Sequence, residues 1–442
     1  MPSAAGDLLL SLPRAGSGTG LHRVNWLVGE SLRDLPRGPE CIKIVGSKGK
    51  GSTAAILHSI LQQLLPCGLF TSPHLEQVEE RFVVGADVVT PAALLTAVEW
   101  VRSTFERRPG WMADDRLGFF EAATAAMWRL FSSYSLGVAV VEAGIGGRLD
   151  ATRVLPGTLA GLTSVELEHT SLLGPTLDHV AFDKSEICPP GGTLIAAATR
   201  TPLDERLAAY CGMRGVRLQW AHDAVRVRDV ECGRDGTRLV LNTNAGEIRD
   251  VWLALRGPHQ VANTQCAVAL ALAWAHGRYG WEQVAAAVRS GLRAVACPGR
   301  FEQVASDPNV FVDVCHTPGS AAACARAARE CLPGEELLLV AGASLDKDVE
   351  GIVSALATVP RVIVATTAHH KGAPVARIAD AARNANPKAE VLMADSIDDA
   401  LPLARRMARD RGLTILVAGG LFLAAEARAV LEGRDPKALR FF

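Results

Sequence analysis

The sequence predicts an α/β protein with two domains, and three observations support this fold class. Short apolar runs typical of β-strands alternate with helical stretches along most of the chain. The chain has 442 residues, of which 49% are hydrophobic, and a chain of this length is longer than a single hydrophobic core usually supports. The alternation of strands and helices also breaks off and restarts near residue 297. We therefore expect one domain over residues 1–296 and a second over residues 297–442.

The N-terminal domain is expected to contain a mainly parallel sheet. The expected strands lie at residues 41–45, 137–141 and 159–165, and the expected helices at 53–65, 120–131, 177–187 and 261–276. Between residues 216 and 255 the apolar runs become short and are interrupted by polar residues, which is typical of a small antiparallel side sheet. In a parallel sheet the functional residues gather at the carboxyl ends of the strands.

The C-terminal domain is expected to be a three-layer α/β unit. Its expected strands lie at residues 310–315, 336–343, 361–367, 390–394 and 414–419, and its expected helices include 320–329 and 421–432. The chain contains no internal repeat and no low-complexity tract.

A glycine-rich turn, GSKGKGST at residues 46–53, follows the first strand and leads into a helix. Its glycines let the backbone approach an anion, Lys50 supplies a positive charge, and the hydroxyl of Ser52 or Thr53 can reach a metal. The standard phosphate-loop signature places Ser or Thr directly after Lys, whereas Gly51 intervenes here. The turn predicts a nucleotide phosphate site. The alternative is an ordinary glycine-rich connection between a strand and a helix.

Polar residues follow two further strands of the same expected sheet. Glu142 ends the run VAVV and precedes a glycine-rich loop, so its carboxylate is placed to hold Mg²⁺. His169 follows the next strand and is a second candidate ligand. The alternatives are that Glu142 pairs with Arg148 and that His169 has only a structural role.

Composition and charge exclude several classes of protein. The net charge of −1 provides no electrostatic basis for binding nucleic acid or a membrane surface. The N-terminus lacks the cationic region of a signal peptide, and no apolar run is long enough to span a bilayer, so we expect a cytoplasmic protein. The ten cysteines show neither C-x-x-C pairs nor the spacing of a thiolate metal site, and we expect free thiols.

A series of motifs in order along the chain resembles the folylpolyglutamate synthase/dihydrofolate synthase branch of the Mur ligase family. The motifs are GSKGKGST (46–53), FTSPHL (70–75), FFE (119–121), EAGIGGRLDAT (142–152), EHTSLLGPTLDHVAFDK (168–184), GPHQVAN (257–263), PGRFE (298–302), DVCHTP (313–318) and DKD (346–348). Each motif alone is weak, but together they cover nearly the whole chain. The resemblance implies an ATP-binding N-terminal domain, a Rossmann-like C-terminal domain and ATP-dependent amide formation between a carboxylate and an amino acid.

The resemblance also implies a set of site residues. The ATP-binding positions are Gly49, Lys50, Gly51, Ser52, Thr53, Asn263, Arg300 and Asp313. The Mg²⁺ ligands are Ser72, Glu142 and His169, the catalytic residues are Lys50, Lys184 and His316, and the carboxylate substrate lies near Phe120, Asp150 and Arg153. Lys184 matches a lysine that is carbamylated in the family and can then bind a second Mg²⁺. Judged by the sequence alone, Lys184 is a surface helix lysine. The resemblance also implies a monomer.

Several positions depart from the family pattern. Ser47 and Lys48 replace Thr and Asn, Arg153 replaces Asn, Glu168 replaces Asp, and Thr317 replaces Asn. The motif coverage favours a ligase that adds L-glutamate to dihydropteroate or a folate. The departures at Arg153, Glu168 and Thr317, which lie near the expected carboxylate and amino-acid substrates, motivate an alternative, a ligase that joins an amino acid or amine to a non-folate carboxylate. A third possibility is a nucleotide-binding protein without catalysis, against which the retention of Lys50, Glu142, His169 and Lys184 argues.

Overall fold

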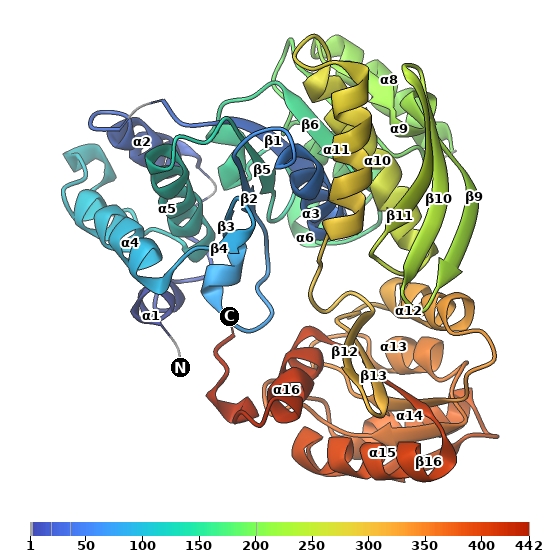
Figure 1. Ribbon diagram of the computed structural model, residues 1–442. Helices are drawn as coiled ribbons and strands as arrows, with labels where there is room; N and C mark the ends of the chain where they lie inside the picture. Colours follow the sequence, from blue (N-terminus) through green and yellow to red (C-terminus); the bar gives the residue numbers. More distant parts are fainter. Residues whose placement is uncertain (1–2, 19, 36, 200, 442) are drawn as a thin grey trace.

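A computed structural model describes residues 3–18, 20–35, 37–199 and 201–441, which form two α/β units with a cleft between them (Figure 1). The strands of the first sheet are β1 (Glu40–Val45), β2 (Cys67–Phe70), β3 (Phe82–Val84), β4 (Asp87–Val88), β5 (Val138–Glu142), β6 (Leu159–Leu162), β7 (Thr193–Ala196) and β8 (Arg217–Trp220). Their order is β4-β3-β2-β5-β1-β6-β7-β8, and all neighbouring pairs from β2 to β8 are parallel. The expected parallel sheet is confirmed, with an antiparallel extension at β3 and β4.

Helices cover both faces of this sheet because its central strands are apolar on both sides. One face carries α1 (Ala4–Leu10), α2 (His22–Ser31), α4 (Pro91–Glu106), α5 (Phe119–Ser133), α7 (Leu177–Ser185) and α8 (Pro202–Met213). The other carries α3 (Lys50–Leu61), α10 (Pro258–Ala275) and α11 (Trp281–Ala294). The short elements are η1 (Val78–Arg81), η2 (Gly110–Met112), η3 (Ala151–Val154), α6 (Thr170–Leu173) and α9 (Ala221–Ala224).

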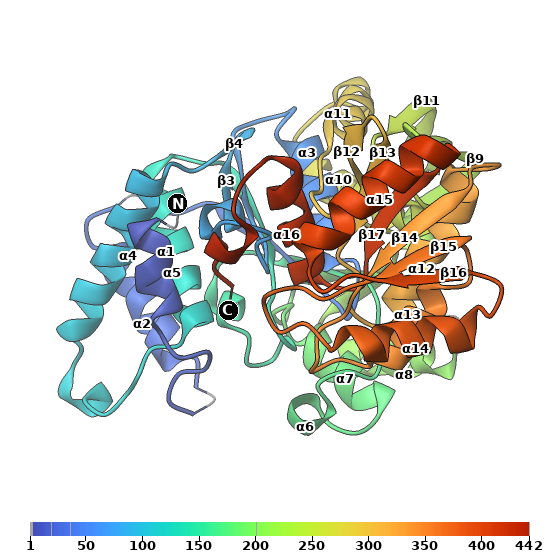
Figure 2. The ribbon, with the colours of Figure 1, turned by 90° about the horizontal axis from the view of Figure 1, so that it is seen from below.

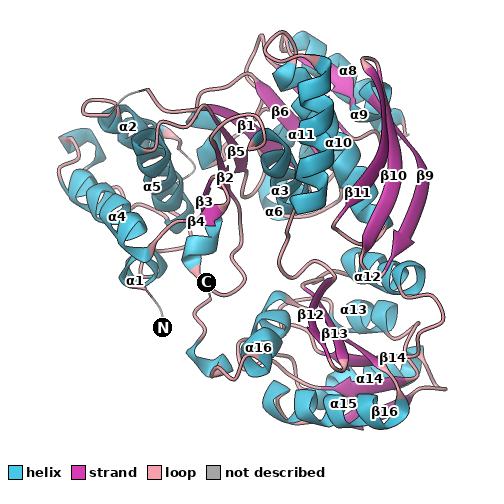
Figure 3. Ribbon diagram, in the orientation of Figure 1, coloured by secondary structure: helices cyan, strands magenta, loops and turns pink. Residues whose placement is uncertain are grey.

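The side sheet consists of β9 (Val225–Gly233), β10 (Gly236–Thr243) and β11 (Gly246–Leu253), and all its pairs are antiparallel (Figure 3). It packs over α10 and α11 in the same core cluster. The expectation that the run beginning at Val216 belongs to this sheet was wrong. That run forms β8, which pairs in parallel with β7 at the edge of the large sheet. An edge strand is partly exposed, so its alternation of polar and apolar residues imitates an antiparallel strand.

Helix α3 begins at Lys50, three residues before the expected start at Thr53, and ends at Leu61. The cause is Gly49, which takes a left-handed conformation with φ +81° as the N-cap and so ends the turn early. The first backbone N–H groups of a three-turn helix therefore point into the loop.

The C-terminal unit is a three-layer α/β sandwich (Figure 2). Its strands are β12 (Glu302–Ser306), β13 (Asn309–Asp313), β14 (Leu337–Ala341), β15 (Val362–Ala365), β16 (Glu390–Met393) and β17 (Thr414–Ala418), in the order β12-β13-β17-β14-β15-β16. Helices α12 (Pro318–Cys331), α13 (Val349–Leu356) and α14 (Val375–Ala385) cover one face, and α15 (Ile397–Arg411) and α16 (Leu421–Leu431) cover the other, followed by η4 (Pro436–Ala438). Only β12 is antiparallel to its neighbour, so the expected α/β class is confirmed.

An ion-pair network joins the two units beside the cleft. Glu76, in the segment after β2, accepts hydrogen bonds from Arg428 at 2.8 Å and from Arg434. Arg428 also contacts Glu302 at 2.6 Å, and the other carboxylate oxygen of Glu302 accepts the Gly299 N–H at 2.7 Å. Glu76 thereby connects the N-terminal unit to α16 and to the linker that precedes β12. No helix in the described part of the chain is long and apolar enough to cross a membrane.

Replacing Glu76 by Gln should loosen the contact between the two units. The variant keeps the size of the side chain but loses the charge that attracts two arginines, and charged hydrogen bonds of this kind contribute about 1.5–3 kcal/mol. We expect amide hydrogen exchange to become faster in residues 297–302 and α16, and to stay unchanged in β1 and β5. Glu432→Gln is the control, because Glu432 pairs with Arg434 without reaching the N-terminal unit. Equal exchange in the two variants would contradict this role of Glu76.

Candidate active site

The largest described cavity, about 610 Å³, lies between the two units. One wall comes from the glycine-rich loop, the ends of β5 and β6, and the start of α10. The other comes from the linker, the end of β13 and the first turns of α12. The sequence-predicted site residues that line it are Gly49, Lys50, Gly51, Ser52, Ser72, Glu142, His169, Asn263, Arg300, Asp313 and His316.

The glycine-rich loop connects β1 to α3, and a side chain would clash at one of its glycines and fit tightly at another. A Cβ on Gly49 would lie 2.3 Å from Asn263 Oδ1, and the residue also has a positive φ. A Cβ on Gly51 would lie 3.3 Å from Glu142 Oε2. Lys50 Nζ donates a hydrogen bond to the Gly46 carbonyl at 2.9 Å and so lies against the loop. The N-terminus of α3 and this ammonium group together favour an anion.

Ser47 and Lys48, two of the departures from the family pattern, attach the loop to the segment after β6. Ser47 Oγ accepts the Glu166 N–H at 2.9 Å. The Lys48 N–H donates to Ser164 Oγ at 2.8 Å, and the Thr163 hydroxyl donates to the Lys48 carbonyl at 2.5 Å. Ser47 thus braces the loop through its side chain, whereas Lys48 does so only through its backbone, and nothing in the structure explains a lysine at this position.

Glu142 ends β5 at the bottom of the cleft and is almost completely buried. Its Oε2 accepts the Ser72 N–H at 2.8 Å. Burial raises the pKa of its carboxyl, whereas the charges of Lys50, Arg300 and Arg81 lower it. The alternative pairing with Arg148 was wrong, because Arg148 contacts Asp183 at 3.4 Å.

His169 lies exposed at the edge of the same cleft. It takes a left-handed conformation with φ +46° as the N-cap of α6, which turns the chain back toward α7. Partial burial and the nearby charges of Lys184, Lys50 and Lys347 lower its pKa, although Glu168 raises it. The ring is therefore neutral at neutral pH and can act as a metal ligand.

Lys184 is buried, 1% exposed, so its interpretation as a surface lysine was wrong. Its Nζ donates to Glu168 Oε1 at 2.9 Å and to the Gly46 carbonyl at 3.2 Å. Burial lowers the pKa of the ammonium group, while Glu168 raises it. Glu168, where the family pattern has Asp, thus makes a side-chain contact with the buried lysine.

On the opposite wall, Asp313 and His316 follow β13. The Asp313 carboxylate accepts the N–H groups of Phe301 and Cys315, both at 2.9 Å, which fixes the linker against the end of the strand. His316 Nδ1 contacts the Val314 carbonyl at 3.2 Å. Desolvation between the cleft walls, together with the charges of Lys48 and Arg300, lowers the pKa of His316 to about 4.

The other predicted site residues do not line the cavity. Thr53 is fully buried inside α3, and Phe120 packs against Phe70 with ring centroids 5.8 Å apart. Asp150 is buried, and its carboxylate accepts the N–H groups of Gly144 and Thr152 and the Thr152 hydroxyl at 2.6–2.9 Å. Arg153 donates to the Arg148 carbonyl at 2.7 Å and lies 3.6 Å from the Glu186 carboxylate. Their substrate and nucleotide roles stay predictions.

Sequence reasoning missed Arg81, a buried cation in the cleft wall beside Glu142. Burial lowers its pKa to about 10. Its Nε donates to His74 Nδ1 at 2.9 Å, and the other ring nitrogen of His74 contacts the Arg440 carbonyl at 3.4 Å. The only signal in the sequence was the position of Arg81 shortly after the FTSPHL motif, since no spacing rule links it to Glu142.

The His74 contact makes stability depend on pH. Burial and Arg81 lower the pKa of His74 from 6.5 to about 3, so the unfolded chain takes up the proton first. The stabilisation is complete above pH 6.5 and is lost as the pH falls toward 3. At pH 5 the free energy of unfolding should be lower by about 2 kcal/mol from this group, since each pH unit below 6.5 corresponds to about 1.4 kcal/mol.

The test is to compare the wild type with His74→Gln, whose amide cannot titrate but can still accept from Arg81. Urea unfolding at pH 8 and pH 5 should show a smaller loss in the variant. His58 and His316, whose pKa values are also lowered to about 4, are present in both proteins and cancel. An equal loss of unfolding free energy in the wild type and in His74→Gln would contradict the assignment of this pH dependence to His74.

Comparison with known proteins places this cleft in a family. The glutamate ligase domain of Mur ligases matches residues 299–421. A probable bifunctional folylpolyglutamate synthase/dihydropteroate synthase of Halobacterium salinarum is 36% identical over 96% of this chain. This chain spans about half of that relative and of its Haloferax volcanii counterpart, 51% and 46%. The dihydrofolate synthase/folylpolyglutamate synthase of Mycobacterium tuberculosis is 30% identical, with 93% of this chain and 89% of the relative covered.

Solved structures agree over both domains. The folylpolyglutamate synthase of M. tuberculosis complexed with ADP matches with a TM-score of 0.85 at 28% identity, covering 97% of this chain and 98% of that one. Escherichia coli FolC in complex with DHPP and ADP matches with a TM-score of 0.81 at 26% identity, covering 98% of each chain. The chain therefore belongs to the folylpolyglutamate synthase/dihydrofolate synthase family, within the Mur ligases.

Proposed function

We propose that this protein is an ATP-dependent ligase that joins L-glutamate to dihydropteroate or to a folate. The observation that carries the proposal is the cleft itself, with an anion-binding loop and Lys50 on one wall and Asp313 and His316 on the other. The names of the relatives supply the substrate class. We further propose that the functional domains are residues 1–296 and 297–442. The monomeric state and cytoplasmic location stay predictions from the sequence.

A carboxylate is a poor electrophile, so such a ligase first converts it to an acyl phosphate with ATP. The amine of glutamate then attacks the acyl carbon and expels phosphate. Enzymes catalyse phosphoryl transfer mainly by positioning the groups and neutralising their charge. Lys50 would leave the Gly46 carbonyl to contact the transferred phosphoryl group, and the N-terminus of α3 and the neighbouring glycines would hold the other phosphates. Asn263 and Arg300 line the same cavity and would contact the nucleotide.

Glu142, with Ser72 and His169, fits a Mg²⁺ ion. The Glu142 carboxylate is buried and has no ion-pair partner in contact among the residues that the structure describes. Its raised pKa indicates that the nearby charges of Lys50, Arg300 and Arg81 do not offset the cost of burial. A divalent cation held by Glu142, the Ser72 hydroxyl and His169 would remove this penalty and neutralise phosphate charge. Gly51 leaves the space between α3 and Glu142 open, since any side chain there would press on the carboxylate.

We also propose that Lys184 is carbamylated in the active protein. Burial lowers its pKa, which raises the fraction of neutral amine that can react with CO₂. The carbamate would lie beside Glu168, whose carboxylate is now 2.9 Å from Nζ. Two adjacent anions need a cation between them, which suits a second Mg²⁺.

The departures from the family pattern provide little support for a different carboxylate substrate. Ser47 braces the phosphate loop, Glu168 pairs with Lys184, and Arg153 lies against Glu186. Thr317 is the N-cap of α12, where its side chain accepts the Ser320 N–H at 3.3 Å. Because each substitution has a local partner, none of them requires a new substrate.

Phosphate release from ATP should therefore depend on both glutamate and a pterin. The assay supplies dihydropteroate, tetrahydrofolate or a panel of other carboxylates, each with and without L-glutamate and other amino acids. We expect turnover only when one of the two pterins and glutamate are both present. Turnover with a non-pterin carboxylate, and with neither pterin, would contradict the folate proposal. ATP binding without any turnover would indicate a non-catalytic protein.

Lys50→Ala should lower kcat by about 10²- to 10³-fold, as does the loss of one group that stabilises a transition state. The ATP dissociation constant should change far less, because the Lys50 charge matters most as the phosphoryl group moves. Single-turnover phosphate release and calorimetric ATP titration separate the two effects. Lys48→Ala is the matched control, since Lys48 lies in the same loop but is braced through its backbone, and its kcat should fall by less than about 10-fold. Equal effects of the two variants would contradict the role of Lys50.

A further inference from the structure

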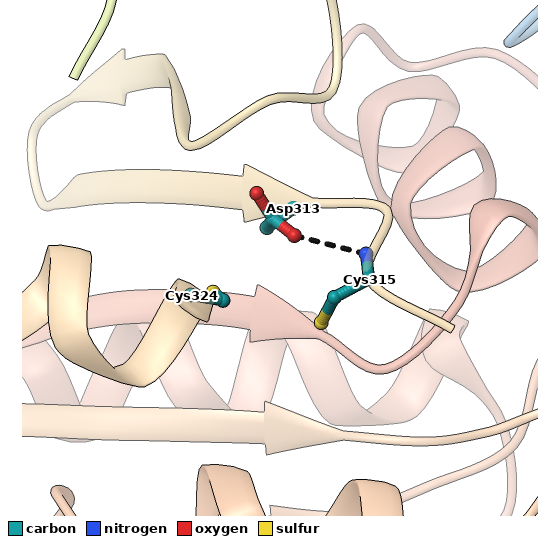
Figure 4. A group of neighbouring side chains, drawn as sticks. All are labelled: Asp313, Cys315 and Cys324. Carbon is teal, nitrogen blue, oxygen red and sulfur yellow. Dashed lines mark hydrogen bonds between the residues drawn. The ribbon is translucent and has the colours of Figure 1, made fainter. Parts of the chain in front are cut away.

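Three side chains with metal-binding chemistry meet in the C-terminal wall of the cleft. Asp313 comes from the end of β13, Cys315 from the following loop, and Cys324 from α12, which folds back over the strand (Figure 4). One carboxylate oxygen and the two sulfur atoms all lie within 4.8 Å of one another. All three residues are buried, although the cavity reaches them.

Two sulfur atoms and one oxygen form a ligand set suited to a borderline-soft cation. Zn²⁺ binds thiolate sulfur at about 2.3 Å and carboxylate oxygen at about 2.0–2.2 Å, so tetrahedral ligand atoms lie about 3.5–4 Å apart. The three ligand atoms lie within 4.8 Å of one another and would have to draw closer to reach this spacing. A hard cation such as Mg²⁺ prefers oxygen ligands and is disfavoured by two thiolates.

We propose that Asp313, Cys315 and Cys324 bind one Zn²⁺-class cation, with a fourth coordination position open to the cleft. Backbone hydrogen bonds already hold the Asp313 carboxylate in place, one from Phe301 to Oδ2 and one from Cys315 to Oδ1. Each oxygen keeps a second lone pair for a metal, and such outer contacts orient metal ligands. Three protein ligands with one open position are typical of exchangeable or catalytic zinc sites, whereas structural sites have four protein ligands.

Metal binding at this cluster requires the release of two protons. The hydrogen bond from Cys324 lowers the pKa of the Cys315 thiol, but burial and the nearby Asp313 carboxylate together outweigh it, and the net pKa is raised. The hydrogen bond with Cys315 and burial raise the pKa of Cys324 well above its usual value. Both thiols are therefore neutral at neutral pH without a metal, and the cation must displace both protons. The affinity for the cation should rise with pH.

The test is a Cd²⁺ titration of the reduced, nucleotide-free protein, followed by thiolate-to-cadmium charge-transfer absorption in the ultraviolet. We expect one equivalent per chain and an affinity that increases from pH 6 to pH 8. Cys324→Ser and Cys315→Ser should each lose more than about 10-fold in affinity, the smallest loss usual for residues that only orient a ligand. The signal depends on thiolates, so it is read separately from the oxygen-rich Glu142 site and from ligase turnover, although Asp313 also belongs to the proposed nucleotide site.

Cys331→Ser is the matched control. Cys331 has a neighbouring thiol in Cys232, but no third ligand in the described part of the chain joins them. This variant should keep the wild-type titration. Three outcomes would each overturn the proposal. They are loss of the signal in Cys331→Ser, an unchanged signal in both Cys315→Ser and Cys324→Ser, and the absence of a charge-transfer band in wild-type protein whose ten thiols are all reduced.

Discussion

The conformation of the phosphate loop depends on the hydrogen bonds that the carbonyl oxygen of Gly46 accepts. It accepts hydrogen bonds from Lys50 at 2.9 Å and from Lys184 at 3.2 Å, and so holds two cationic side chains beside the loop. A Cβ on Gly46 would lie 2.0 Å from Thr163 Oγ1, so the loop can approach the end of β6 only through glycine. Glu168 offsets the repulsion between the two cations. The loop is thus charged and positioned before any anion arrives, which is what electrostatic catalysis requires.

Around this loop, several departures from the family pattern brace the chain, and two of them, Ser47 and Glu168, also line the cavity. Ser47 and Glu168 hold the loop and the buried lysine, and Thr317 caps α12. A bracing contact needs only a donor or acceptor of suitable length, so several residue types serve equally well. Lys50 and Glu142 meet stricter demands, because charge and distance to a phosphate are both constrained.

The cleft depends on the docking of two units that could in principle fold separately. Glu76 attracts Arg428 across the boundary, and Arg428 is fixed in turn by Glu302, whose other oxygen holds the linker at Gly299. These contacts are ionic, and an apolar contact accompanies them, because Leu75 of the N-terminal unit packs into a core cluster of the C-terminal unit. Closure of the cleft around substrates would keep water away from an acyl phosphate.

The sequence by itself determined much of the local structure: the α/β alternation, the glycine-rich turn before α3 and the side sheet. These follow from periodicity and from backbone preferences over a few residues, which neighbouring residues control. The resemblance of the sequence motifs to a known family supplied eleven of the residues that line the cleft. Only the tertiary structure decided which polar side chains are buried and which distant ones meet. It buried Lys184, placed β8 in the large sheet, put Arg81 beside Glu142, and brought Cys324 to Cys315. The reason is physical: such distances are set by how helices pack on sheets, and no local pattern encodes them.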